Sequence, residues 1–113
     1  MNSPPRTPRY LWYGDDFTGA TDTLATVADA GLRALLFLGV PSPSQLRAAG
    51  PLDALGIAGA ARTMDPSAMT AELEPVARFQ AAMRAPVLHY KCCSTFDSSP
   101  AVGSLGMALR ILN

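Results

Sequence analysis

Residues 10–20 read YLWYGDDFTGA, and this stretch gives the clearest indication of the fold. The aromatic and aliphatic run over residues 10–13 predicts a short buried strand, and the glycines and acidic residues of 14–19 predict a turn after it. Good helix formers follow over residues 20–30, and Gly31 is placed to end that helix in a left-handed conformation. The chain therefore opens with a strand, a loop and a helix.

The same alternation continues along the chain. Nearly continuous apolar runs predict further strands, of which the first is expected to be covered on both faces, over residues 32–40, 54–60 and 86–90. A capping residue followed by proline predicts three helix starts, at Ser42-Pro43, Asp65-Pro66 and Ser99-Pro100. Pro75 is expected to kink or divide the helix that starts at Asp65-Pro66.

This pattern predicts an α/β fold in three layers, a mainly parallel sheet with helices on both faces, which is a Rossmann-like arrangement. Doubly wound sheets usually have about five or six strands, whereas the sequence predicts four before Asn113. We therefore expect residues 10–113 to be the amino-terminal part of a larger, incomplete domain. Residues 1–9, with three prolines, are expected to form a disordered arm.

The composition indicates a globular chain with a small partner. Of the 113 residues, 49% are apolar, and nine acidic and nine basic side chains cancel, so no general attraction to nucleic acid or to an anionic membrane is expected. The apolar runs are shorter than the ~20 residues of a membrane span, and no signal peptide is recognised, which favours a cytoplasmic location. The adjacent Cys92 and Cys93 are too close for a disulfide, and no metal site is expected from them.

Three polar groups follow predicted strands and should meet at one edge of the sheet, where ligands of parallel α/β folds bind. They are Asp15 and Asp16 after the first strand, Arg62 after the third, and Lys91 with Ser94, Thr95, Asp97 and Ser98 after the fourth. Carboxylates accept hydrogen bonds from hydroxyl groups, whereas Arg and Lys bind carboxylates. Together the groups predict a site for a hydroxylated anion.

Plainer interpretations of the same residues stay open. Asp16 or Thr18 would simply cap the following helix while Asp15 faces water, and Arg62 and Lys91 would pair with the aspartates as a structural network. The loop over residues 94–99 is also typical of an ordinary turn. His89 lies within a predicted strand, where a structural role is expected, and Trp12 is expected in the core.

Other nucleotide and phosphate chemistries find no support in the sequence. It contains neither the glycine-rich loop with Lys-Ser/Thr of nucleotide-binding P-loops nor the dinucleotide fingerprint. The residues two positions after Asp15 and Asp16 are Phe17 and Thr18, so the acidic spacing of haloacid-dehalogenase-like phosphatases is missing. The phosphoacceptor aspartate that a receiver domain needs after its third strand is also missing.

Two separated motifs resemble the four-carbon acid sugar kinase family. The first is GDDFTGATD at residues 14–22 and the second is YKCCSTFDSSP at residues 90–100, and the similarity covers about residues 10–112. The CSTFDS form is similar to the branch that includes 3-oxo-tetronate kinases. The resemblance therefore implies that this chain is the opening part of a sugar-binding domain.

What the resemblance implies is a two-domain kinase. Its first domain binds a four-carbon acid sugar, a tetronate or oxo-tetronate, and the CSTFDS form favours an oxo-tetronate. A later domain, absent from this chain, supplies ATP and Mg²⁺, with phosphate transferred to a terminal hydroxyl. Asp16 would orient that hydroxyl. The chain alone is then expected to be inactive. We also keep open a stand-alone module that binds an acid sugar or a protein, a truncated gene product, and a homo-oligomer.

Overall fold

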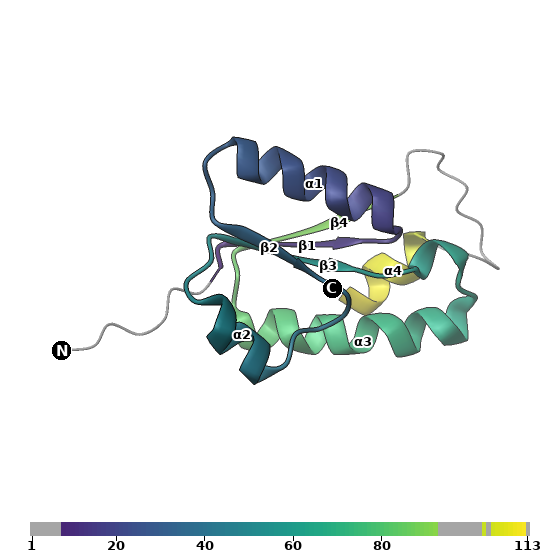
Figure 1. Ribbon diagram of the computed structural model, residues 1–113. Coiled ribbons are helices and arrows are strands. Elements are labelled where there is room, and N and C mark those ends of the chain that lie inside the picture. Colours follow the sequence, from purple (N-terminus) through teal and green to yellow (C-terminus); the bar gives the residue numbers. More distant parts are fainter. Residues whose placement is uncertain (1–7, 93–102, 104, 113) are drawn as a thin grey trace.

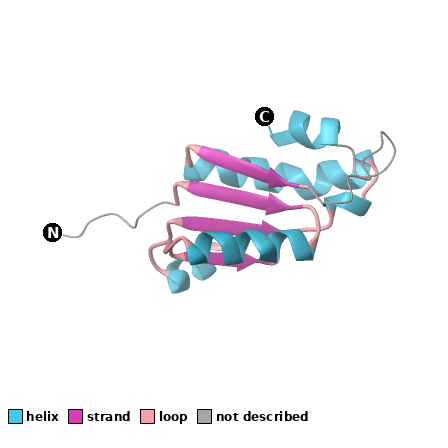
Figure 2. Cartoon of the chain, turned by 90° about the horizontal axis from the view of Figure 1, so that it is seen from above, coloured by secondary structure: helices cyan, strands magenta, loops and turns pink. Residues whose placement is uncertain are grey.

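The centre of the molecule is a sheet of parallel strands (Figure 1). The structure, a computed structural model, describes residues 8–92, 103 and 105–112. Within these residues the strands are β1 (Tyr10–Gly14), β2 (Ala34–Phe37), β3 (Ala54–Ala58) and β4 (Val87–Lys91). They lie side by side in the order β2-β3-β1-β4, and all four run in the same direction (Figure 2).

Helices cover both faces of this sheet, as Figure 1 shows. Helix α1 (Phe17–Asp29) lies on one face, and α2 (Pro43–Ala49), α3 (Pro66–Met83) and α4 (Leu105–Leu112) lie on the other. A short 3-10 turn, η1 (Ala61–Thr63), connects β3 to α3. The predicted three-layer, Rossmann-like α/β arrangement is therefore confirmed.

Successive side chains of β1 point to opposite faces, as the twofold alternation of a strand requires. Leu11 and Tyr13 enter the main core with side chains of α3, including Met69 and Leu73. Trp12 lies on the face of α1, where its indole Nε1 donates a hydrogen bond to the Ala20 carbonyl at 3.2 Å. Since Trp12 is only 1% exposed, its predicted place in the core is confirmed.

The strand predicted over residues 54–60 contains two glycines, Gly56 and Gly59, which have different positions in the structure. Gly56 lies inside β3 because the Trp12 ring packs on it: a Cβ there would be 2.1 Å from Trp12 Cε2. Gly59 follows the strand, whose last residue is Ala58. The strand thus keeps one glycine to admit a large neighbouring side chain.

Two predictions about the elements were wrong. The strand expected over residues 32–40, covered on both faces, is limited to Ala34–Phe37, and Leu35 is 41% exposed. The reason is that β2 lies at the edge of the described sheet and pairs only with β3. The alternative in which Pro75 divides the helix is also wrong, since α3 runs without a break from Pro66 to Met83 and buries Leu73 and Val76, on either side of the proline, in the core; the alternative of a kink stays a prediction.

Helix boundaries agree with the capping signals where the structure describes them. Ser42 and Asp65 are the N-caps of α2 and α3, and each is followed by proline. Gly31 has a φ of +88°, just after α1, as predicted. Two predictions lie outside the described residues: residues 1–7 of the expected arm, and the helix start at Ser99-Pro100.

Among the helices of the described part, none is both long enough and apolar enough to cross a bilayer.

Candidate functional site

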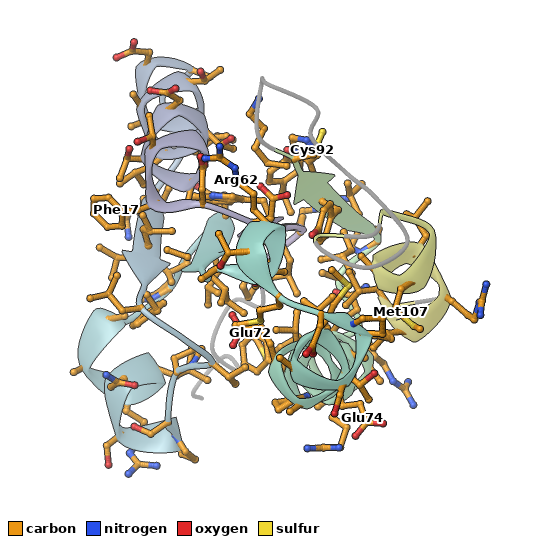
Figure 3. All side chains as sticks on the ribbon, turned by 90° about the vertical axis from the view of Figure 1, so that its right-hand side faces the viewer. Phe17, Arg62, Glu72, Glu74, Cys92 and Met107 are labelled. Carbon is orange, nitrogen blue, oxygen red and sulfur yellow. The ribbon has the colours of Figure 1, made fainter. Side chains whose placement is uncertain are left out.

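The carboxyl ends of three neighbouring strands lie at one level, because Gly14 is in register with Ala58 and with Lys91. Residue 15, which follows β1, is hydrogen-bonded through its backbone to the end of β4 and to the turn after β3. Its backbone N–H donates to the Lys91 carbonyl at 3.0 Å, and its carbonyl accepts from the Arg62 N–H at 3.2 Å. The structure therefore brings Asp15, Asp16, Arg62 and Lys91 together at one edge, as Figure 3 shows for Arg62 beside the end of β4 at Cys92.

The two aspartates have different surroundings. Asp15 is 3% exposed, so the interpretation in which it faces water is wrong. Asp16 is the N-cap of α1, and its Oδ1 accepts a hydrogen bond from the Gly19 N–H at 2.8 Å. Helix α1 thus begins at Phe17, three residues earlier than predicted, because Asp16 rather than a later residue caps it.

Asp16 also forms an ion pair across the site. Its Oδ2 lies 3.5 Å from Nη1 of Arg62, and the two side chains are 24% and 33% exposed. Ion pairs near the surface contribute about 0–1 kcal/mol, since water screens both charges. The pair is thus partly open to solvent at the edge of the sheet.

Lys91 lies against the first turn of α1. A Cβ added at Gly19 would be 3.4 Å from Lys91 Cγ and 3.7 Å from Cε, and 2.9 Å from Asp16 Oδ1. The lysine stem and the Asp16 carboxylate therefore lie on either side of Gly19. Both flank the helix amino terminus, where unpaired N–H groups favour an anion.

Tyr90 adds a buried hydroxyl below these charges. Its ring stacks on Tyr13 with the centroids 5.4 Å apart. Burial raises the pKa of the Tyr90 hydroxyl above its ordinary value, and the negative charge of Asp15 raises it further. The Tyr90 hydroxyl thus stays protonated at neutral pH, and its pKa is raised in part by the nearby negative charge of Asp15.

Four predicted site residues, Ser94, Thr95, Asp97 and Ser98, lie outside the described residues. The described residues on either side of them are both next to the site. Lys91 bonds to residue 15, and the Gly103 N–H donates to the Met64 carbonyl at 2.7 Å, directly after the turn that holds Arg62. Phe17, 60% exposed, lies at the opposite rim at the start of α1 (Figure 3).

Sequence reasoning correctly placed His89 in a strand. The hydroxyl of Tyr10 is hydrogen-bonded to His89 Nδ1, with the two rings edge to face, so the histidine has a structural partner away from the site. Tyr90 was not assigned to the site from the sequence, although Tyr90 is the first residue of the motif at residues 90–100 and precedes Lys91.

The described residues differ from a typical metal site. They contain no cluster of three or more His, Cys, Asp or Glu side chains that could hold a metal. Among the described residues, the charged groups at this edge are the carboxylates of Asp15 and Asp16 and the cations of Arg62 and Lys91.

A Rossmann-like sheet with charged residues converging on its carboxyl edge defines the class as a small-molecule-binding α/β domain. The comparison with known families is more specific. The chain belongs to the family of sugar-binding N-terminal domains, whose profile matches residues 10–113.

Characterised relatives are kinases. The chain is 45% identical over 100 residues to a 3-oxo-isoapionate kinase of Paraburkholderia graminis, covering 88% of this chain and 21% of the relative. It is 36% identical to a 3-oxo-tetronate kinase of Methylobacterium radiotolerans and 35% identical to one of Cupriavidus necator, each over 87% of this chain and 22% of the relative. The resemblance to acid sugar kinases is thus confirmed, and the chain spans about a fifth of the length of these relatives.

Proposed function

We propose that this chain is the substrate-binding part of an ATP-dependent kinase that phosphorylates a 3-oxo acid sugar on a terminal hydroxyl. The observation that carries the proposal is the convergence of Asp16, Arg62 and Lys91 on one edge of the sheet, in a family of sugar-binding domains. ATP and Mg²⁺ are assigned to the second domain that the resemblance to acid sugar kinases implies, and the relatives named above are kinases.

The cations are assigned to the carboxylate of the sugar. Arg62 offers a planar fork of N–H donors that fits a carboxylate in bidentate fashion, and Lys91 offers a compact positive charge. Both lie beside the amino terminus of α1, which adds a partial positive charge of its own. Three favourable electrostatic contributions then act on the same negative group.

The aspartates are assigned to the hydroxyl groups. Asp16 is the more accessible of the two, at 24% against 3% for Asp15, so Asp16 contacts a hydroxyl at the opening and Asp15 one at the bottom of the site. Phosphoryl transfer depends mainly on positioning and on charge neutralisation. Asp16 therefore orients the hydroxyl that attacks the phosphate, and Ser94, Thr95, Asp97 and Ser98 complete the site.

Oxo-tetronate and oxo-isoapionate are the substrate candidates, because the relatives named above are kinases of these two 3-oxo acids. An oxo-tetronate was the expectation from the sequence motif, whereas the relative with 45% identity is named for oxo-isoapionate. We propose the shared class, a short 3-oxo acid sugar. Parallel ATP-consumption assays with both acids on the complete protein decide between them.

The binding test is calorimetry of the complete protein with a stable tetronate, erythronate, and with erythritol, which lacks the carboxylate. Arg62→Ala is expected to weaken erythronate binding by about ten- to a hundredfold, the range for a hydrogen bond to a charged group. Ala60, Arg62 and Thr63 share one turn, so Thr63→Ala is the matched control in the same turn, and Asp16→Ala tests the hydroxyl contact. Equal affinities for erythronate and erythritol would refute the carboxylate contact.

A chemical footprint provides an independent test, because Lys91 is the single lysine of this sequence. Saturating erythronate is expected to protect it from an amine-reactive label, as read by mass spectrometry of the peptide that contains residue 91. Labelling at the same rate with and without erythronate would remove Lys91 from the site. Binding without ATP consumption by the complete protein would favour the stand-alone module.

A further inference from the structure

The turn that carries Arg62 rests on the buried Tyr13 and the partly exposed Glu72. Tyr13, fully buried, donates its hydroxyl proton to Glu72 Oε2 at 2.8 Å and accepts from the Ala61 N–H at 3.2 Å. The same Oε2 lies 3.4 Å from the Ala60 N, which donates to it. One hydroxyl and one carboxylate oxygen thus bind the two backbone N–H groups that precede Arg62.

Gly59 packs directly against this pair. A Cβ added at Gly59 would lie 2.1 Å from Glu72 Oε2 and 2.2 Å from the Tyr13 hydroxyl oxygen. The chain therefore passes over the pair with a glycine, in direct contact with both oxygens. Figure 3 shows Glu72 pointing into the molecule between the sheet and α3, whereas Glu74, two residues further along the same helix, points outward.

The opposite side of the same turn is bound to β1 and to the site. Gly59 N–H donates to the Gly14 carbonyl at 3.0 Å, and Arg62 N–H donates to the Asp15 carbonyl at 3.2 Å. The Arg62 side chain then reaches Asp16 at 3.5 Å. The backbone of residues 59–62 is thus held by backbone hydrogen bonds on the side of β1 and by the side chains of Tyr13 and Glu72 on the side of α3.

Burial raises the pKa of the Tyr13 hydroxyl above its ordinary value, and the hydrogen bond to Glu72 raises it further. The hydroxyl therefore remains a donor to Glu72 throughout the neutral range. A hydrogen bond to a carboxylate is also stronger than one between neutral groups, and this one is partly shielded from water. This contact is accordingly a firm one on which the turn can rest.

We propose that Tyr13 and Glu72 are positioning residues for the anion site, because they hold η1 in the place from which Arg62 meets Asp16 and the carboxylate of the sugar. Neither residue contacts the substrate in this proposal. This proposal rests on the proposed function, since it needs Arg62 to bind the carboxylate. It adds two residues, Tyr13 and Glu72, that lie outside both sequence motifs.

The central test is a double-mutant cycle on the complete protein, with erythronate affinity measured by calorimetry. Tyr13→Phe removes only the hydroxyl and is expected to weaken binding about tenfold, the equivalent of one hydrogen bond to a charged group. In an Arg62→Ala background, Tyr13→Phe is expected to change the affinity no further, because no guanidinium remains to be positioned. Tyr10→Phe is the matched control, since that hydroxyl bonds to His89 on the other face.

A second pair of variants tests Glu72. Glu72→Ala removes the acceptor for Tyr13 and Ala60 and is expected to weaken binding at least as much as Tyr13→Phe, whereas Glu72→Gln keeps an acceptor oxygen and is expected to recover most of the affinity. Glu74→Ala, exposed on the same helix, is expected to bind normally. Thermal unfolding of each variant verifies that it is folded at the temperature of the binding experiment.

The outcomes separate this proposal from the proposed function. Equal weakening by Tyr13→Phe with and without Arg62, or normal binding by both Tyr13→Phe and Glu72→Ala, overturns the positioning role while the carboxylate contact of Arg62 stands. If Arg62→Ala alone leaves erythronate binding unchanged, the proposed role of Arg62 fails, and the positioning role fails with it. Weakening that depends on Arg62 supports both.

Discussion

Substitution of Gly19 by alanine is expected to change the affinity of the site for its ligand much more than the stability of the chain. The Cβ of alanine would lie 2.9 Å from Asp16 Oδ1, a few tenths of an ångström closer than a carbon and an oxygen normally approach. It would also lie 3.4 Å from Lys91 Cγ. We expect the Asp16 carboxylate to turn away, so that both its cap of α1 and its ion pair with Arg62 are disturbed.

Two opposing effects of similar size act on stability. Alanine in place of glycine in a helix stabilises by up to about 1 kcal/mol. Loss of the N-cap hydrogen bond between Asp16 and the Gly19 N–H costs about 0.5–2 kcal/mol. The free energy of unfolding is therefore expected to change by less than about 1 kcal/mol in either direction, as the difference of these two terms.

Binding is expected to respond much more strongly. If Asp16 contacts the sugar, Gly19→Ala displaces its carboxylate, and erythronate affinity should fall by about tenfold or more, the equivalent of one charged hydrogen bond. The assays are calorimetry and thermal unfolding of the same samples. Ala25→Gly, an exposed position of the same helix, is the control: it should lower stability by about 1 kcal/mol and leave affinity unchanged. Normal erythronate binding by Gly19→Ala would refute the placement of Asp16 in the site.

Further expected outcomes concern the core and the alkaline range. Gly56→Ala places a Cβ 2.1 Å from the Trp12 ring and should destabilise by about 1–3 kcal/mol or more, measured by urea unfolding; a fully stable variant would contradict the packing of Trp12 on β3. The buried hydroxyls of Tyr13 and Tyr90 have a pKa raised above the ordinary value of about 10. Their contribution to stability is complete below the unfolded pKa and is lost as pH rises above it, because only the unfolded tyrosines then lose their protons readily. Urea unfolding at pH 8 and pH 11 should show this fall, and Tyr90→Phe should make it shallower, whereas the same slope in that variant would show that Tyr90 does not contribute.

The elements of the fold were determined by local sequence. Aspartate or serine before proline marked the starts of α2 and α3, since both signals act within one turn of helix. Glycine after α1 marked its end in the same way. The parallel α/β class followed from apolar strands that alternate with helices, a pattern that depends only on which faces must be buried.

Part of the candidate site was also accessible from sequence. Charged residues that directly follow parallel strands must lie at one edge of the sheet, which explains why Asp16, Arg62 and Lys91 were grouped correctly. The roles of the individual aspartates were not accessible. Whether Asp15 or Asp16 is buried depends on how closely α1 and η1 approach β1, and this is a matter of packing between segments far apart in the chain.

Local patterns by themselves therefore determined the elements, the class of fold and the edge at which polar residues gather, because hydrophobic alternation and capping act over a few neighbouring residues. Only the tertiary structure decided that β2 is an exposed edge strand, that α3 continues through Pro75, that Gly56 admits Trp12, and that Tyr13 meets Glu72 beneath the turn of Arg62. Each of these depends on contacts between residues distant in the sequence, whose partners are set by sheet order and side-chain volume rather than by any pattern within one segment.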